Sequence, residues 1–195
     1  MYFQGYFPQY KRNEHNVDTD KHQSGRFPYG DKFVDNYMIT SKQPNIEKII
    51  SQISNDNFLS EKKLKEGIND SLKELEKREW NCDVKILEVI EKNYQDIQLF
   101  FAPEHPIPMM ILELTRRILD LIGMNSTFFI NMPILASGGI SLKGQDIPIY
   151  PCIVKYLNFK EYEKKYFANT CLWKFNAEFD KFIIEYINWC WKEKL

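Results

Sequence analysis

The hexapeptide DIQLFF, residues 96–101, is the feature that most constrains the fold of this chain. Its dense apolar and aromatic residues predict a short buried strand, which Pro103 ends. A single strand cannot satisfy its own backbone N–H and C=O groups, so the fold has to supply strand partners. Two sources stay open: short strands elsewhere, for example near STFFI at residues 126–130, or a region N-terminal to this sequence.

Apolar residues elsewhere in the chain recur mostly at helical spacing. The periodic segments are residues 44–54, 60–80, 84–94, 106–123, 150–157, 158–167 and 176–195. Ser60, Asp83 and Asn158 stand where helix N-caps are expected. The strongest pattern is that of residues 106–123, which end at Gly123, a natural C-terminal cap. We therefore expect a mostly helical protein.

The predicted fold class is α/β and predominantly helical, with few short parallel strands flanked by helices. Residues 1–5, MYFQG, resemble the remnant of a protease-cleavable purification tag, so we exclude them from the fold prediction. We expect one domain over residues 6–195. It would contain an irregular aromatic segment at 6–43, a core of helices and a strand at 44–123, and a C-terminal helical part at 124–195.

The composition excludes several classes of protein. With 26 basic and 27 acidic residues the net charge is −1, which provides no electrostatic argument for binding nucleic acid. The cysteines at 82, 152, 171 and 190 form no CxxC or Cys/His pattern, so we expect no metal site, free thiols and a cytoplasmic location. We also expect no membrane span and no signal peptide, because no run of 18 apolar residues occurs and the N-terminus is polar and aromatic.

His105 lies between the predicted strand and the helix at 106–123. Loops outside the carboxyl ends of strands are where ligands bind in α/β sheets, so His105 could act as a general base that Glu104 orients. The helix start also offers N–H groups to an anion, although Pro106 and Pro108 contribute none. The alternative is that His105 merely occupies the turn that begins at Pro103.

Two further segments could bind an anion. Arg116 and Arg117 are candidates for a phosphate or carboxylate, and the alternative is that they complement the helix C-terminus while solvated. SGGISLKG, residues 137–144, could cradle a phosphate through its backbone N–H groups, and the alternative is a flexible turn.

Four segments follow one another in a familiar order: FPYGDKFVDNYM, KELEKREWNCDVKILEVIEKNY, LFFAPEHPIPMMILELTRRILDLIG and IPIYPCIVKYLNF. In this order they resemble the WcbI-type polysaccharide biosynthesis enzymes, bacterial proteins associated with capsule and surface-glycan gene sets. Residues 100–123 and 147–157 match the family pattern best, and the resemblance extends from about residue 26 onward.

The resemblance implies a coenzyme A (CoA) or acetyl-CoA dependent acetyltransferase that modifies a glycan acceptor in capsular or surface polysaccharide biosynthesis. It implies an SGNH-like fold in which His105 is the general base. Bound CoA is multiply anionic, and its phosphates could meet Arg12, Arg116, Arg117 and Lys143. Whether the protein is a homo-oligomer stays open.

Two departures from the family pattern bear on this expectation. The family motif Gly-Asn-Cys-Gln does not occur, and Ala102 occupies the Asp position of the Asp-x-x-His pattern. Two readings stay open: the nucleophile lies in an N-terminal region outside this sequence, or the protein lacks it. An alternative function is a non-catalytic glycan- or partner-binding module that uses the aromatic N-terminal segment and WCWKEKL at residues 189–195 as contacts.

Overall fold

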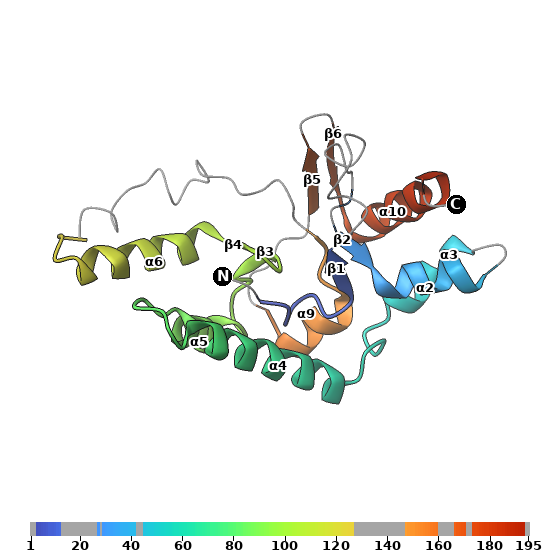
Figure 1. Cartoon of the computed structure of the whole chain (residues 1–195). Helices are drawn as coiled ribbons and strands as arrows, with labels where there is room; N and C mark the ends of the chain where they lie inside the picture. Colours follow the sequence, from blue (N-terminus) through green and yellow to red (C-terminus); the bar gives the residue numbers. More distant parts are fainter. Residues whose placement is uncertain are drawn as a thin grey trace.

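The structure, a computed structural model, describes residues 3–12, 27, 29–41, 45–126, 147–159, 166–170 and 173–193. In these residues helices predominate, and the strands form three separate two-stranded sheets (Figure 1). The predicted predominance of helices is therefore confirmed for the described part of the chain.

The described helices follow the apolar periodicity and the caps of the sequence. They are α2 (Lys32–Thr40), α3 (Ile46–Ile53), α4 (Glu61–Glu79), α5 (Leu87–Asn93), α6 (Pro108–Leu121), α9 (Pro151–Leu157) and α10 (Phe179–Glu193). The side chains of Asn45 and Ser60 accept hydrogen bonds from Lys48 N and Lys63 N, so both cap their helices as polar side chains at these positions do. Asp83, the expected cap of a helix at 84–94, precedes a helix that starts only at Leu87.

All strand pairs in the described residues are antiparallel. β1 (Tyr10–Arg12) pairs with β2 (Tyr29–Asp31), β3 (Phe100–Ala102) with β4 (His105–Pro106), and β5 (Tyr166–Thr170) with β6 (Trp173–Ala177). The prediction of parallel strands is wrong for these pairs. Parallel neighbours need a crossover of a dozen or more residues, whereas only Pro103 and Glu104 separate β3 from β4.

Two local predictions are also corrected. Residues 6–43 were expected to be irregular, but Asp31 caps α2 by accepting hydrogen bonds from Phe33 N and Val34 N. Residues 158–167 were expected to form a helix with Asn158 at its start. Asn158 instead ends α9 in the left-handed conformation with φ of 53°, which asparagine tolerates better than most residues, and Tyr166 already belongs to β5.

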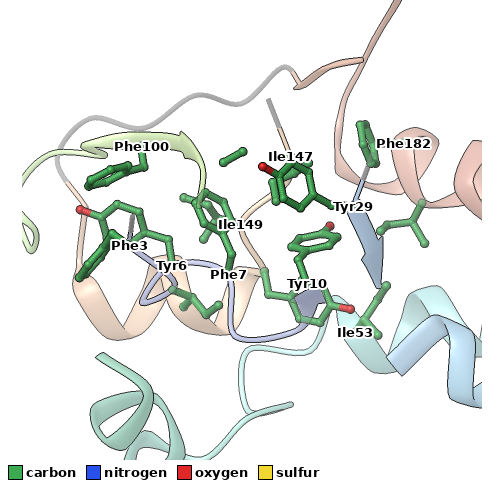
Figure 2. Close-up of a cluster of buried hydrophobic side chains, with 14 of the residues drawn as sticks. Phe3, Tyr6, Phe7, Tyr10, Tyr29, Ile53, Phe100, Ile147, Ile149 and Phe182 are labelled. Carbon is green, nitrogen blue, oxygen red and sulfur yellow. The ribbon is translucent and has the colours of Figure 1, made fainter. Parts of the chain in front are cut away.

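The N-terminal aromatic residues lie at the centre of the core. Phe3 is fully buried, its ring stacks on Phe100 at 5.5 Å between centroids, and its N–H donates to Pro103 O at 2.8 Å. Tyr6 donates from its hydroxyl to the backbone oxygens of Tyr94 and Ile97. Figure 2 shows Phe3 and Tyr6 within one cluster of buried side chains. The packing therefore includes Phe3 in the core, whereas the resemblance of residues 1–5 to a tag remnant predicts no such role.

The last helix closes the other side of the core. α10 buries Phe182, Ile183, Tyr186 and Cys190, as its periodicity predicts, and Ile187 as well. Phe27 meets the rings of Phe182 and Tyr186 edge-on at 5.4 and 5.2 Å between centroids. These contacts join the segment before β2 to the C-terminal helix. The division of the chain into one domain over residues 6–195 stays a prediction.

Candidate functional site

The β3–β4 hairpin determines where His105 lies. Leu99, Phe100 and Ala102 are fully buried, and Ala102 pairs with His105 across the hairpin. Ile107 N donates to Leu99 O at 2.9 Å, which carries the pairing up to the start of α6. Burial of β3 therefore holds the backbone of His105 at the point where the hairpin meets the helix.

A segment near α9 also contacts the backbone of β3. Ile147 N donates to Phe101 O at 3.0 Å, so the segment before α9 runs beside β3. β4, Ile107 and Ile147 thus supply hydrogen-bond partners to the backbone of the predicted strand. The strand partner suggested near residues 126–130 lies outside the described residues from Thr127 onward.

The imidazole of His105 is half-buried, and its Nδ1 atom is shielded from solvent. The ring lies edge-on to the ring of Tyr29, with 6.5 Å between centroids and an interplanar angle of 83°. Tyr29 is buried and comes from β2, far from His105 in the sequence. Glu104 is exposed at the turn of the hairpin, beside His105 in the chain. The proposed roles of His105 and Glu104 stay predictions.

Arg12 is brought towards the same place by the β1–β2 ladder. Its register partner is Tyr29, the residue whose ring contacts His105. Paired residues on neighbouring antiparallel strands have Cα atoms about 5 Å apart. The topology therefore places Arg12 one strand away from the neighbour of His105, which no spacing in the sequence indicated. Lys143 and the SGGISLKG segment lie outside the described residues.

Arg116 and Arg117 are already paired with carboxylates. Both guanidinium groups bind Glu113 at 2.7 Å, Arg116 also binds Asp120 at 2.6 Å, and Arg117 also binds Glu88 of α5 at 2.6 Å. The hydrogen bond from Arg116, followed by that from Arg117, lowers the pKa of Glu113 to about 2. An incoming phosphate would have to displace these carboxylates. The proposed roles of all three arginines stay predictions.

A buried polar network anchors β2 and therefore Tyr29. Asp31 is fully buried, and its carboxylate accepts hydrogen bonds from Tyr150 Oη at 2.6 Å, Phe33 N at 2.9 Å and Val34 N at 3.1 Å. Burial raises the pKa of Asp31 to about 6, although these hydrogen bonds oppose the shift.

Tyr186 of α10 continues the network from the other side. Its hydroxyl donates to Asp35 Oδ1 at 2.6 Å and accepts from Asp31 N at 3.1 Å. No motif or spacing in the sequence pointed to this network as a whole. One part of the network has a signal in the sequence. Asp31 precedes two apolar residues at helical spacing, Val34 and Met38, which is the pattern of a helix N-cap.

The described residues contain neither a metal-binding cluster nor a membrane-spanning helix. No group of three or more His, Cys, Asp or Glu residues there could hold a metal ion. No helix among them is both long and apolar enough to cross a membrane. Cys82, Cys152 and Cys190 are in no disulfide bond, and Cys171 lies outside the described residues.

The sequence profile of the family described as "Polysaccharide biosynthesis enzyme WcbI" matches residues 1–127. The chain belongs to the WcbI family. The match includes Arg12, the β3–β4 hairpin with Glu104 and His105, and the arginine pair of α6, whereas Lys143 lies beyond it. It also begins before Tyr6, in agreement with the burial of Phe3.

A solved WcbI structure has the same fold. Its description calls WcbI a novel polysaccharide biosynthesis enzyme. The protein in that structure is the native form, without a disulfide bond between CoA and a cysteine. It matches with a TM-score of 0.69 and 16% sequence identity, over 99% of this chain and 60% of that chain. This likeness shows the fold alone, and this chain spans 60% of the WcbI chain it matches. No curated protein matches the sequence.

Proposed function

We propose that this protein is a CoA-dependent acetyltransferase of surface polysaccharide biosynthesis in which His105 is the general base. The observation that carries the proposal is the position of His105 within the family match. Its half-buried imidazole lies at the end of a hairpin that is anchored in the core, and a second segment supplies an aromatic wall, Tyr29. A partly buried imidazole that keeps some access to solvent suits a group that exchanges protons with a bound substrate.

In this proposal His105 accepts the proton of an acceptor hydroxyl as the hydroxyl oxygen forms a bond to the acyl carbon. The carbon–sulfur bond of the thioester breaks, and the proton passes from His105 to the departing thiolate. Acetyl-CoA supplies the activated acyl group. The ring of Tyr29 lies edge-on to the imidazole, with 6.5 Å between the ring centroids, and is proposed to help position it. Glu104 lies in the turn of the hairpin, directly before His105, and is proposed to orient it.

The CoA phosphates are proposed to meet Arg12 first. Arg12 occupies the register position opposite Tyr29, whereas Arg116 and Arg117 are engaged by Glu113, Asp120 and Glu88. A fully charged guanidinium recognises phosphate through two parallel hydrogen bonds, which is the contact such a site requires. Lys143 remains a second candidate from outside the described residues.

Isothermal titration of CoA into the wild-type protein, Arg12→Ala and Arg116→Ala tests the cofactor proposal. We expect wild type and Arg116→Ala to bind CoA with similar affinity, and Arg12→Ala to bind at least about tenfold more weakly, the loss of one charge-assisted contact. Dephospho-CoA is the matched ligand that reports which phosphate is involved. Absence of CoA binding to the folded wild-type protein would refute the cofactor proposal.

A second candidate function is a non-catalytic glycan- or partner-binding module. The observation that favours it is Trp191, which is 47% exposed at the C-terminal end of α10. Exposed indole rings stack on the apolar faces of sugars and partners. Titration of capsule-derived oligosaccharides while tryptophan fluorescence is monitored, with Trp191→Phe as the variant, separates the two functions. Glycan binding that depends on Trp191 in a protein without CoA binding would favour the module.

A further inference from the structure

The N-terminal aromatic residues fill the core and also hold the β3–β4 hairpin. The backbone N–H of Phe3 donates to Pro103 O at 2.8 Å, in the turn of the hairpin and two residues before His105. The Phe3 ring stacks on Phe100 of β3, with 5.5 Å between centroids and 27° between the ring planes. Figure 2 shows these two rings beside each other. Phe3 therefore contacts both the turn and the first strand of the hairpin.

Tyr6 holds the other end of the hairpin through its hydroxyl group. The hydroxyl hydrogen is shared between Tyr94 O at 2.9 Å and Ile97 O at 3.0 Å. The hydroxyl oxygen accepts a hydrogen bond from Leu99 N at 3.4 Å. Leu99 O in turn accepts from Ile107 N at 2.9 Å, at the start of α6. A chain of hydrogen bonds therefore runs from the Tyr6 hydroxyl through the backbone of Leu99 to Ile107.

Burial makes the Tyr6 hydroxyl a fixed part of this arrangement. Tyr6 is fully buried, and burial raises the pKa of its hydroxyl well above the ordinary range of a tyrosine, so the group stays protonated and can donate. A buried hydroxyl that loses its hydrogen-bond partners is costly, whereas phenylalanine fills almost the same space without that requirement. Packing alone therefore does not require the hydroxyl, which instead ties three backbone groups together.

His105 lies between two positions that these contacts hold. Pro103 stands two residues before it and Ile107 two residues after it, and each takes part in a backbone hydrogen bond to the core. Because the backbone is held on both sides, the direction in which the His105 side chain leaves it is held as well. We propose that Phe3 and Tyr6 are positioning residues that set the place of the His105 imidazole. The inference rests on the proposed general-base role of His105, because a displacement of about 1 Å can lower a reaction rate about 100-fold.

Amide hydrogen exchange in Tyr6→Phe tests the hold on the hairpin, because this change removes the hydroxyl and keeps the ring. The exchange rates of Leu99 N–H and Ile107 N–H report local opening of the hairpin. The N–H of Val154 in α9 is the reference outside the hairpin. Tyr37→Phe is the matched control, because Tyr37 is a half-buried tyrosine on α2. Circular dichroism verifies that each variant is folded.

The NMR signal of the His105 imidazole reports its placement without any need for activity. The chain has three histidines, His15, His22 and His105, so the variant His105→Asn assigns the signal. The ring of Tyr29 lies edge-on to this imidazole at 6.5 Å between centroids. Its ring current therefore makes the chemical shift of His105 sensitive to a displacement of the hairpin.

We expect Leu99 N–H and Ile107 N–H to exchange at least about tenfold faster in Tyr6→Phe, while Val154 N–H changes less than about twofold. The signal of His105 should shift, and Tyr37→Phe should change none of these quantities. The kcat of acetyl transfer should fall at least about tenfold with the KM for acetyl-CoA unchanged, since placement of the base affects the transition state.

Unchanged exchange in the hairpin of Tyr6→Phe overturns the proposal, and so does an unchanged signal of His105. Exchange that accelerates equally at Val154 also overturns it, because Tyr6 would then contribute only to overall stability. If Tyr6→Phe does not fold, Phe3→Leu takes its place and should give the same pattern, since it weakens the contact with Phe100. A wild-type protein without acetyl transfer refutes the proposed function, and the exchange rates and the NMR signal then decide the positioning.

Discussion

Replacement of Asp31 by asparagine should change how the stability of this protein depends on pH. Asp31 is fully buried, caps α2 and accepts a hydrogen bond from Tyr150. Its other titratable neighbours are Tyr186, which accepts a hydrogen bond from Asp31 N, and Asp35, whose charge opposes its ionisation. Asparagine retains a carbonyl oxygen that can accept from Phe33 N and Val34 N, but it does not titrate.

The magnitude follows from the pKa of Asp31, which burial raises from 3.8 to about 6. Each pKa unit corresponds to about 1.4 kcal/mol, so the ionised carboxylate costs about 3 kcal/mol of the free energy of unfolding above pH 6. Between pH 3.8 and about 6 the folded protein binds more protons than the unfolded chain. Because of this, the contribution of Asp31 to stability falls as the pH rises through this window. The cost of ionising the buried Asp31 carboxyl is fully present above this pH window and absent below it.

Urea denaturation of wild type and Asp31→Asn, followed by tryptophan fluorescence at pH values on both sides of the window, measures this difference. We expect the wild type to lose up to about 3 kcal/mol relative to Asp31→Asn as the pH rises from acidic to neutral. Asp83→Asn is the control, since Asp83 is exposed. The reasoning is refuted if the difference in free energy of unfolding between the two proteins does not change with pH. It is also refuted if the wild type becomes more stable than the variant as the pH rises.

Two further substitutions test the packing. Phe3→Ala should lower the free energy of unfolding by about 3–5 kcal/mol in urea denaturation, because Phe3 is fully buried against Phe100. The partly exposed Phe33 provides the comparison. A smaller loss in Phe3→Ala than in Phe33→Ala would contradict a core role for Phe3. Glu79→Ala should cost about 2 kcal/mol, because the buried Glu79 carboxylate accepts from Ile86 N at 2.8 Å and Leu87 N at 3.0 Å. Glu76 is exposed, so Glu76→Ala should hardly change the free energy of unfolding. Equal losses of stability in the two variants would count against a stabilising role for the hydrogen bonds of Glu79.

The helices were the part of the fold that the sequence could predict. In α4 the leucine and isoleucine stripe and the Ser60 cap point to the same structure, so local preference and tertiary packing agree. The two ends of the helix predicted over 158–167 are wrong, because Asn158 adopts a left-handed conformation at the end of α9 and Tyr166 belongs to β5, and periodicity detects neither; residues 160–165 lie outside the described residues. α2 was missed because its nine residues lie in a segment rich in glycine, proline and asparagine.

The candidate site could be predicted only in part. His105 was identified because a strand end and a helix start bracket it in the sequence. Its contact with Tyr29 depends on the β1–β2 ladder and on the buried Asp31 network. The network joins residues more than a hundred positions apart in the sequence, such as Asp31 and Tyr150. The ion pairs of Arg116 and Arg117 were within reach of the sequence, because Glu113 and Asp120 stand three or four residues away on the same helix.

The central claim is that His105 is the general base of acetyl transfer. The most direct test compares the release of free thiol from acetyl-CoA by wild type and His105→Asn, in the presence of a panel of sugar acceptors. We expect the variant to bind CoA as tightly as the wild type and to transfer the acetyl group about 10²–10⁴-fold more slowly, the contribution of a positioned general base. A variant that binds CoA and transfers as fast as the wild type would contradict the account.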